Sequence, residues 1–122
     1  MKKILVIDDD HKNIFALTAI LRSRGFEVLS ALSAGEGLSM MSKGSGIGIV
    51  LLDMMMPDVD GYEMLSRIRG NEELRSMPVI AVTAQAMTGD RERCLAAGAD
   101  DYVSKPIDVD RLMKLLNQYA NS

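Results

Sequence analysis

The chain has 122 residues, of which 48% are hydrophobic and 25% charged, a size and composition typical of one globular domain. Its net charge of −3 and its lack of a Lys/Arg cluster argue against nucleic acid as the main partner. No apolar run approaches the length of a membrane span, no signal peptide is evident and the single Cys94 cannot form an internal disulfide, so we expect a cytoplasmic protein without direct membrane contact.

The first part of the chain alternates short apolar runs with helical patterns. The run at residues 4–7 predicts a buried strand that ends on three aspartates. Asp10 is a suitable N-cap for the helix that follows, and Gly25 marks the end of that helix. Residues 26–31 alternate between apolar and polar positions and predict a second strand. Ser33 then caps a weaker helix.

A third apolar run, at residues 47–52, is too short for a lone helix and rich in β-branched residues. It therefore predicts a strand that is buried on both faces, as in a parallel sheet. Asp53 stands where this strand stops, and Pro57 and Asp60-Gly61 then bring turn chemistry. In open α/β sheets ligands gather at the carboxyl ends of the strands, which makes Asp53 the central candidate for chemistry.

The last part of the chain repeats the alternation. A helix ends near Gly70, a fourth strand at residues 79–82 ends on Thr83, and a further helix ends at Gly98. A brief fifth strand at residues 101–103 turns into the final helix. That helix carries an apolar stripe at the spacing of an amphipathic helix: Leu112, Leu115, Leu116 and Tyr119.

Five strand-then-helix units in strict alternation predict an α/β fold with a parallel sheet and helices on both faces. Right-handed crossovers leave few topologies, and of these we expect the five-stranded flavodoxin-like order 2-1-3-4-5. Since no linker or repeat divides the sequence, residues 1–122 are expected to form a single domain.

Residues of chemical interest follow four of the five predicted strands: Asp8 and Asp9, Asp53, Thr83, and Lys105. In a parallel sheet these positions share one edge. Carboxylates that lie close together repel one another, which raises their pKa values unless a cation is present. A hard cation such as Mg²⁺ prefers oxygen ligands, and Lys105 could pair with an oxyanion. Taken singly, each residue is explained by helix capping or turn formation; their coincidence favours a joint site.

Together these motifs resemble the receiver domains of two-component response regulators, and the resemblance extends from Lys3 to about Tyr119. The matching motifs are Ile7-Asp8-Asp9, Leu52-Asp53 with Met56-Pro57 and Asp60-Gly61, Val82-Thr83-Ala84, and Gly98-Ala99 with Asp101-Tyr102 and Lys105-Pro106.

The resemblance implies that Asp53 is the phosphoacceptor. Mg²⁺, or Mn²⁺ as an alternative, would be held by Asp8, Asp9, Asp53 and the backbone carbonyl of Met55, with Asp9 a more direct ligand than Asp8. The phosphoryl donor would be a histidine kinase or a histidine phosphotransfer protein, and the domain would catalyse its own phosphorylation and dephosphorylation without being a turnover enzyme.

The resemblance also assigns roles at the last two strands. Thr83 and Lys105 would contact the phosphoryl group, Tyr102 would occupy the aromatic switch position coupled to Thr83, and the bond before Pro106 would be cis. Residues 10–17 and 89–98 are similar to receivers of hybrid histidine kinases. The chain is therefore expected to be either a free-standing regulator or the receiver of a longer protein.

Three alternatives are weighed against this interpretation. An aspartyl-phosphate phosphatase would carry a second Asp two residues after its nucleophile, where this chain has Met55. A flavodoxin-like cofactor binder would need a phosphate-cradling first loop, which the acidic residues 8–10 oppose. A module that only binds partners would not need the complete set of strand-end residues.

Overall fold

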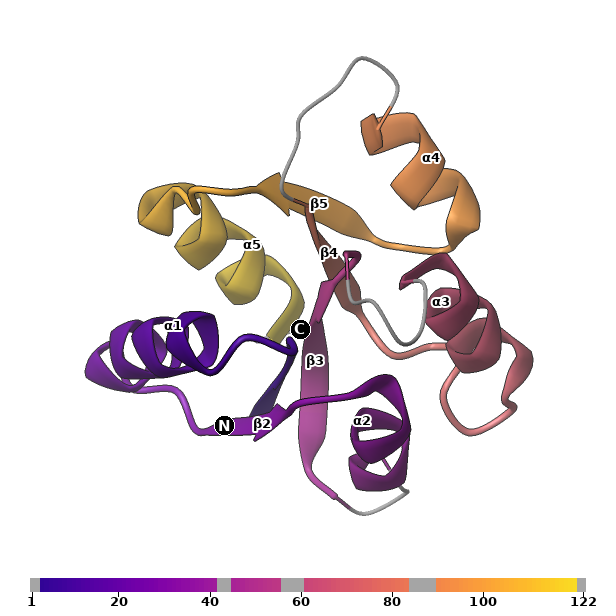
Figure 1. Cartoon of the computed structure of the whole chain (residues 1–122), viewed down its shortest axis with the longest axis horizontal. Coiled ribbons are helices and arrows are strands. Elements are labelled where there is room, and N and C mark those ends of the chain that lie inside the picture. Colours follow the sequence, from indigo (N-terminus) through magenta and orange to yellow (C-terminus); the bar gives the residue numbers. More distant parts are fainter. Residues whose placement is uncertain (1–2, 42–44, 56–60, 84–89, 121–122) are drawn as a thin grey trace.

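The structure is a computed structural model that describes residues 3–41, 45–55, 61–83 and 90–120. Within these ranges five parallel strands form one sheet in the order β2-β1-β3-β4-β5, with a helix after each strand (Figure 1). The α/β fold and its flavodoxin-like strand order are confirmed. The strands are β1 (Lys3–Ile7), β2 (Val28–Ala31), β3 (Ile47–Asp53), β4 (Val79–Thr83) and β5 (Asp101–Ser104), and the helices are α1 (His11–Ser23), α2 (Ala34–Met40), α3 (Gly61–Gly70), α4 (Asp90–Ala97) and α5 (Val109–Ala120).

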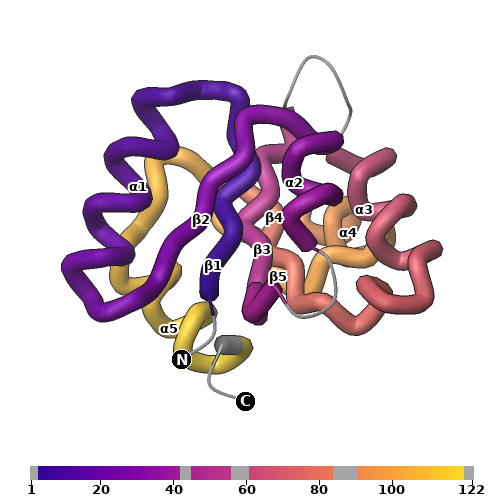
Figure 2. Tube along the Cα trace, turned by 90° about the horizontal axis from the view of Figure 1, so that it is seen from below, coloured from indigo at the N-terminus to yellow at the C-terminus, as the bar shows by residue number. Residues whose placement is uncertain are grey.

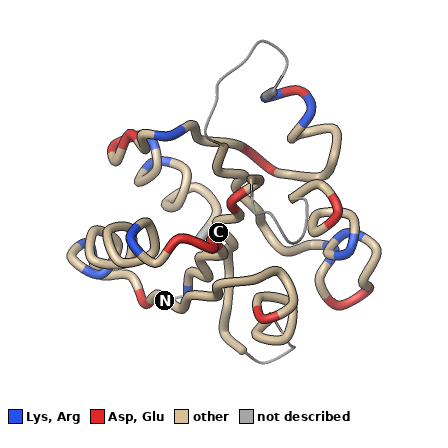
Figure 3. The backbone as a smooth tube through the Cα atoms, viewed as in Figure 1, with Lys and Arg blue, Asp and Glu red and all other residues tan. Residues whose placement is uncertain are grey.

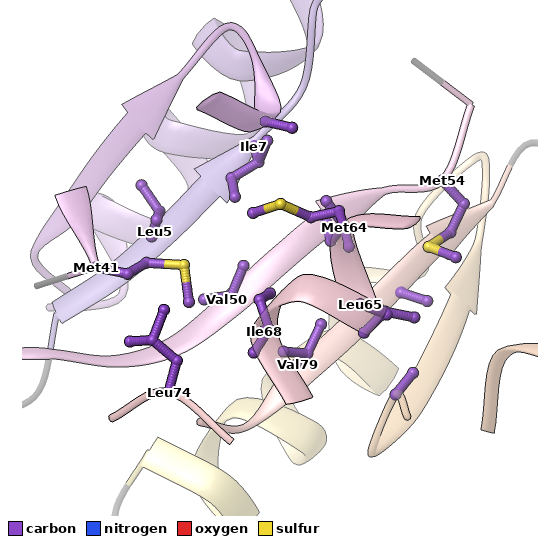
Figure 4. Packing of buried hydrophobic residues seen from close by; sticks show 14 of the residues in the cluster. Leu5, Ile7, Met41, Val50, Met54, Met64, Leu65, Ile68, Leu74 and Val79 are labelled. Carbon is purple, nitrogen blue, oxygen red and sulfur yellow. The ribbon is translucent and has the colours of Figure 1, made fainter. Parts of the chain in front are cut away.

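The helices cover both faces of the sheet. Helices α1 and α5 pack on one face, and α2, α3 and α4 pack on the other (Figures 1 and 2). Each face has its own apolar cluster, because successive strand residues point to opposite sides. In β3 every residue is buried, and Val50 and Leu52 join the cluster under α2 and α3 while Ile49 and Leu51 join the one under α1 and α5 (Figure 4). This burial on both faces explains the continuous apolar run in the sequence.

Helix α1 ends in a Schellman motif that also sets where β2 begins. Gly25 has a φ of 90°, which glycine adopts without steric cost, and its N–H donates to the carbonyl of Arg22. The N–H of Phe26 donates back to the carbonyl of Leu21. Since Phe26 belongs to this helix cap, β2 starts at Val28 rather than at residue 26, where the alternating pattern placed it.

Helix α4 ends in the same way, with Gly98 at a φ of 118°. The N–H of Gly98 donates to Leu95 O and that of Ala99 donates to Cys94 O. Space is a second reason for glycine here, because a Cβ at position 98 would lie 2.9 Å from the side chain of Arg69.

Arg69, near the end of α3, joins several segments at the end of the sheet opposite Asp53. Its guanidinium donates to the carbonyls of Arg75 at 2.9 Å, Met77 at 2.7 Å and Gly98 at 2.8 Å, and to the carboxylate of Asp100 at 3.0 Å. Asp100 also accepts the N–H of Val79. This one side chain therefore connects the end of α3, the loop before β4, the end of α4 and the approach to β5.

We predict that Arg69→Ala lowers the free energy of unfolding by about 2 kcal/mol, since it leaves several part-buried acceptors without a donor. The matched control is Arg67→Ala, which removes an exposed pair with Glu63 one turn away and should cost at most about 0.5 kcal/mol. Urea unfolding of both variants measures the difference. Equal losses would show that the Arg69 contacts contribute no more than a surface pair.

Candidate functional site

The acidic residues after β1 and at the end of β3 meet at one edge of the sheet (Figure 3). Asp8 directly follows β1 and Asp53 ends β3, and the two strands are neighbours with Ile7 opposite Leu52. Asp8 is 6% exposed and Asp53 4%, whereas Asp9 faces solvent. Carboxylate oxygens of all three lie within 4.8 Å of one another. The strand-end convergence expected from the sequence is therefore present in the structure.

Backbone N–H groups fix one oxygen of each buried carboxylate. Asp8 Oδ1 accepts from the N–H of Asp10 at 2.9 Å, and Asp53 Oδ1 accepts from the N–H of Met55 at 2.9 Å. Lys105 Nζ lies 3.7 Å from Oδ2 of Asp8 and 3.7 Å from Oδ2 of Asp53. The Oδ2 atoms of both carboxylates therefore lie next to the same lysine ammonium group.

Burial is the main cause that raises the pKa of Asp8 above its ordinary value. The N–H of Asp10 acts in the opposite direction, the charge of Asp53 raises this pKa further, and Lys105 lowers it. Burial and the charge of Asp53 together outweigh the effects of the Asp10 N–H and of Lys105, so the pKa of Asp8 is raised on balance.

The three carboxylates fit a hard divalent cation. They offer oxygen ligands at mutual distances that one ion can span, and added positive charge would oppose the burial and the Asp53 charge that raise the pKa of Asp8. Met55, whose carbonyl the sequence suggests as a further ligand, follows Asp53 by two residues, and its side chain is 63% exposed.

The polar residues of β4 and β5 lie beside this acidic cluster. Thr83 ends β4 with its side chain buried, and its carbonyl accepts the N–H of Lys105 at 2.8 Å. Tyr102, on β5, pairs with Ala81 of β4, and its side chain is half-buried against the apolar cluster under α3 and α4. The Lys105–Pro106 bond is cis, as expected. Ala84 and the sequence motif at residues 56–60 lie outside the described residues.

A cavity of about 280 Å³ adjoins the acidic cluster between α1 and the segment that follows β5. Asp8, Asp53 and Lys105 line one end, and Leu17 and Ile20 of α1 line the apolar remainder. Asn13 also lines it and was missed by the sequence analysis. A signal for it existed, because Asn13 precedes Leu17 by four residues and therefore lies on the helix face that is apolar further along.

The response regulator receiver domain family matches residues 4–117. The chain belongs to this family. Receiver domains are signalling switches that accept phosphoryl groups from histidine kinases or phosphotransfer proteins and generally bind Mg²⁺ at an acidic pocket. Family membership favours the receiver interpretation over the phosphatase and flavodoxin-like alternatives.

Two curated relatives and one solved structure illustrate the similarity. The chain is 37% identical to Hybrid signal transduction histidine kinase L of Dictyostelium discoideum over 98% of its own length but only 7% of that protein. It is 34% identical to the Polar-differentiation response regulator DivK of Brucella ovis, over 97% of this chain and 95% of the relative. A CheY-like receiver domain protein of Methanospirillum hungatei has a TM-score of 0.83 at 33% identity, over 99% of this chain and 95% of that one.

Across the described ranges, no helix has the length and apolar composition needed to cross a bilayer.

We predict that Asp8→Asn weakens Mg²⁺ binding by about tenfold or more, because it removes one of three converging charges. The same substitution should raise the free energy of unfolding without divalent cations, since a neutral amide avoids the burial of a charge and the proximity of Asp53, which together raise the pKa of Asp8. Calorimetric Mg²⁺ titration and urea unfolding measure the two effects, with Asp110→Asn on the exposed side of α5 as the control. Unchanged Mg²⁺ affinity in Asp8→Asn would contradict this assignment.

Proposed function

We propose that Asp53 accepts a phosphoryl group from a phosphohistidine of a histidine kinase or a histidine phosphotransfer protein, and that the domain then changes conformation. The observation that carries this proposal is the burial of the Asp53 carboxylate and the contacts of its two oxygens. The carboxylate is buried, one oxygen is fixed by the N–H of Met55, and the other faces Lys105 Nζ at 3.7 Å. Family membership supports the same role.

In this proposal a carboxylate oxygen of Asp53 attacks phosphorus in line as the bond from phosphorus to the histidine nitrogen breaks. Lys105 Nζ and the Thr83 hydroxyl contact oxygens of the transferred group, so that charge stabilisation and positioning are the protein's main contributions. Mg²⁺, held by Asp8, Asp9, Asp53 and the Met55 carbonyl, would supply the remaining positive charge. The domain modifies itself and later loses the phosphoryl group by hydrolysis, without turning over a separate substrate.

Exposed apolar side chains around the site support binding of a protein donor. Phe15 on α1 is 78% exposed, and Leu32 and Met55 follow the carboxyl ends of β2 and β3 with exposed side chains. Exposed apolar side chains on the segments that follow β2 and β3, the strand ends where the acidic cluster lies, suit a transient protein interface.

The proposed switch runs from Thr83 to Tyr102. Contact of the Thr83 hydroxyl with the phosphoryl group would draw this side chain toward Asp53, and the Tyr102 ring would turn inward behind it. Pairing of β4 with β5 supports the coupling, with Thr83 opposite Ser104. A phosphoryl group that interacts with one arrangement more favourably than with the other by a few kcal/mol is enough for such a shift.

We further propose that residues 1–122 act as one cytoplasmic receiver unit. The family match over residues 4–117 and the absence of a predicted linker support this extent. Such a unit occurs in two kinds of protein among the relatives. In the response regulator DivK the match spans 95% of the protein, and in the hybrid kinase it spans 7%.

Asp53 is expected to be the residue that takes up phosphate from acetyl phosphate, and only with Mg²⁺ present. Intact-mass measurement should show one added phosphoryl group on the wild type and on the control Asp110→Asn, and none on Asp53→Asn. Equal uptake by Asp53→Asn would overturn the assignment.

Slow self-dephosphorylation is expected, because the residue two positions after Asp53 is the apolar and exposed Met55, which cannot orient a water. Gln85, which the sequence suggests as a weak water-positioning residue, lies outside the described residues. Met55→Asn should hasten phosphate loss several-fold, as measured by phosphate release from the phosphorylated domain, and Met55→Leu is the apolar control. If Met55→Asn and Met55→Leu lost phosphate at the same rate as the wild type, side-chain polarity at this position would not set the lifetime.

A further inference from the structure

Arg111, in the first turn of α5, contacts Tyr102 in two ways. Its Nη2 donates to the carbonyl oxygen of Tyr102 at 3.0 Å, and its guanidinium carbon lies 6.0 Å from the centre of the Tyr102 ring. The same Nη2 lies 3.3 Å from Oδ1 of Asp101, which also accepts the N–H of Tyr102 at 2.8 Å. Arg111 and Asp101 therefore hold the backbone of Tyr102 at both its N–H and its carbonyl, while Arg111 also faces the ring.

The geometry suits arginine in particular. A planar guanidinium donates from its edge while its face or rim approaches an aromatic ring, whereas the ammonium of lysine is a single point of charge. Because β5 is the edge strand of the sheet, its outer carbonyls have no neighbouring strand to bind. Arg111 thus donates a hydrogen bond to the outward-facing carbonyl of Tyr102 and also interacts with the ring of the same residue.

The position of Arg111 favours one orientation of the ring. The Arg111 side chain is 48% exposed and lies at the rim of β5, while the Tyr102 ring is half-buried on the face toward α3 and α4. An inward turn of the ring, toward Thr83, would move it away from this rim. The contact between the cation and the ring would then be lost.

We propose that Arg111 is a positioning residue that holds the Tyr102 ring in the orientation seen in this structure, 6.0 Å from its guanidinium carbon, and so sets the fraction of unphosphorylated protein in the active arrangement. This inference rests on the proposed function, in which Tyr102 turns inward when Asp53 is phosphorylated. Only the cation–ring contact differs between the two orientations, and loss of such a half-exposed contact shifts the equilibrium by about fivefold. By linkage, whatever favours the inward ring also tightens binding of a phosphoryl mimic at Asp53.

The test uses ¹⁹F NMR of the 122-residue chain labelled with 3-fluorotyrosine. The chain has only three tyrosines, so its spectrum is simple to assign. The Tyr102 resonance is assigned with Tyr102→Phe and followed with and without beryllofluoride and Mg²⁺. Arg111→Ala removes both contacts with Tyr102 and the ion pair with Asp101, Arg111→Lys keeps the charge, and Lys114→Ala removes an exposed cation one turn further along α5. Thermal unfolding of each variant shows that it is folded.

In Arg111→Ala the Tyr102 resonance of the free protein should move toward the position that beryllofluoride produces in the wild type. The beryllofluoride concentration for half-saturation should fall by about fivefold. Arg111→Lys should lie between Arg111→Ala and the wild type, and Lys114→Ala should match the wild type.

The outcomes separate this inference from the function on which it rests. Suppose that beryllofluoride moves the Tyr102 resonance while Arg111→Ala changes neither this resonance in the protein without beryllofluoride nor the half-saturation concentration. In that case Arg111 serves only as a hydrogen-bond donor to the backbone of the edge strand. The inference is then wrong, and the proposed switch stands. If beryllofluoride binds and does not move the Tyr102 resonance, the switch and the inference both fail. Should Arg111→Ala not fold, the comparison of Arg111→Lys with the wild type decides in the same way.

Discussion

The structure depends on holding two buried carboxylates, Asp8 and Asp53, next to each other at one edge of a sheet. Such a pair is unfavourable unless its charges are offset, and the pKa of Asp8 is raised by its burial and by the charge of Asp53. Two backbone N–H groups and Lys105 provide part of the compensation. In the proposed function, a divalent cation would supply the rest of the positive charge, next to the position that the phosphoryl group would take.

The fold supplies the rigidity that this arrangement needs. Pairing of β1 with β3 places Asp8 beside Asp53, and both faces of these strands are covered by apolar clusters under the helices. The contacts of Arg69 fix the opposite end of the sheet. Conformational change is therefore expected at Thr83, which ends β4, and on the edge strand β5 at Tyr102, whose ring lies near the guanidinium of Arg111.

Much of this could be predicted from the sequence, because periodicity locates the strands and parallel strands bring their carboxyl ends together. The convergence of Asp8, Asp9 and Asp53 follows from those two rules alone. The start of β2 could not be predicted, since it depends on whether Phe26 joins the cap of α1 or the strand. The contact of Arg111 with Tyr102 was also hidden, because it depends on how α5 returns past the edge of β5. The sequence likewise gave no way to tell that Asp8 is buried while Asp9 is exposed.

The central claim, that the buried Asp53 carboxylate forms an acyl phosphate with help from a divalent cation, is tested most directly by chemical trapping. The chain is treated with phosphoramidate, a donor with a phosphorus–nitrogen bond, and then reduced with borohydride, which converts a phosphoaspartate to homoserine. Peptide mass spectrometry should find homoserine at position 53, in amounts that disappear when Mg²⁺ is removed by a chelator. Homoserine at another aspartate, or at position 53 in equal amounts with and without Mg²⁺, would contradict the account.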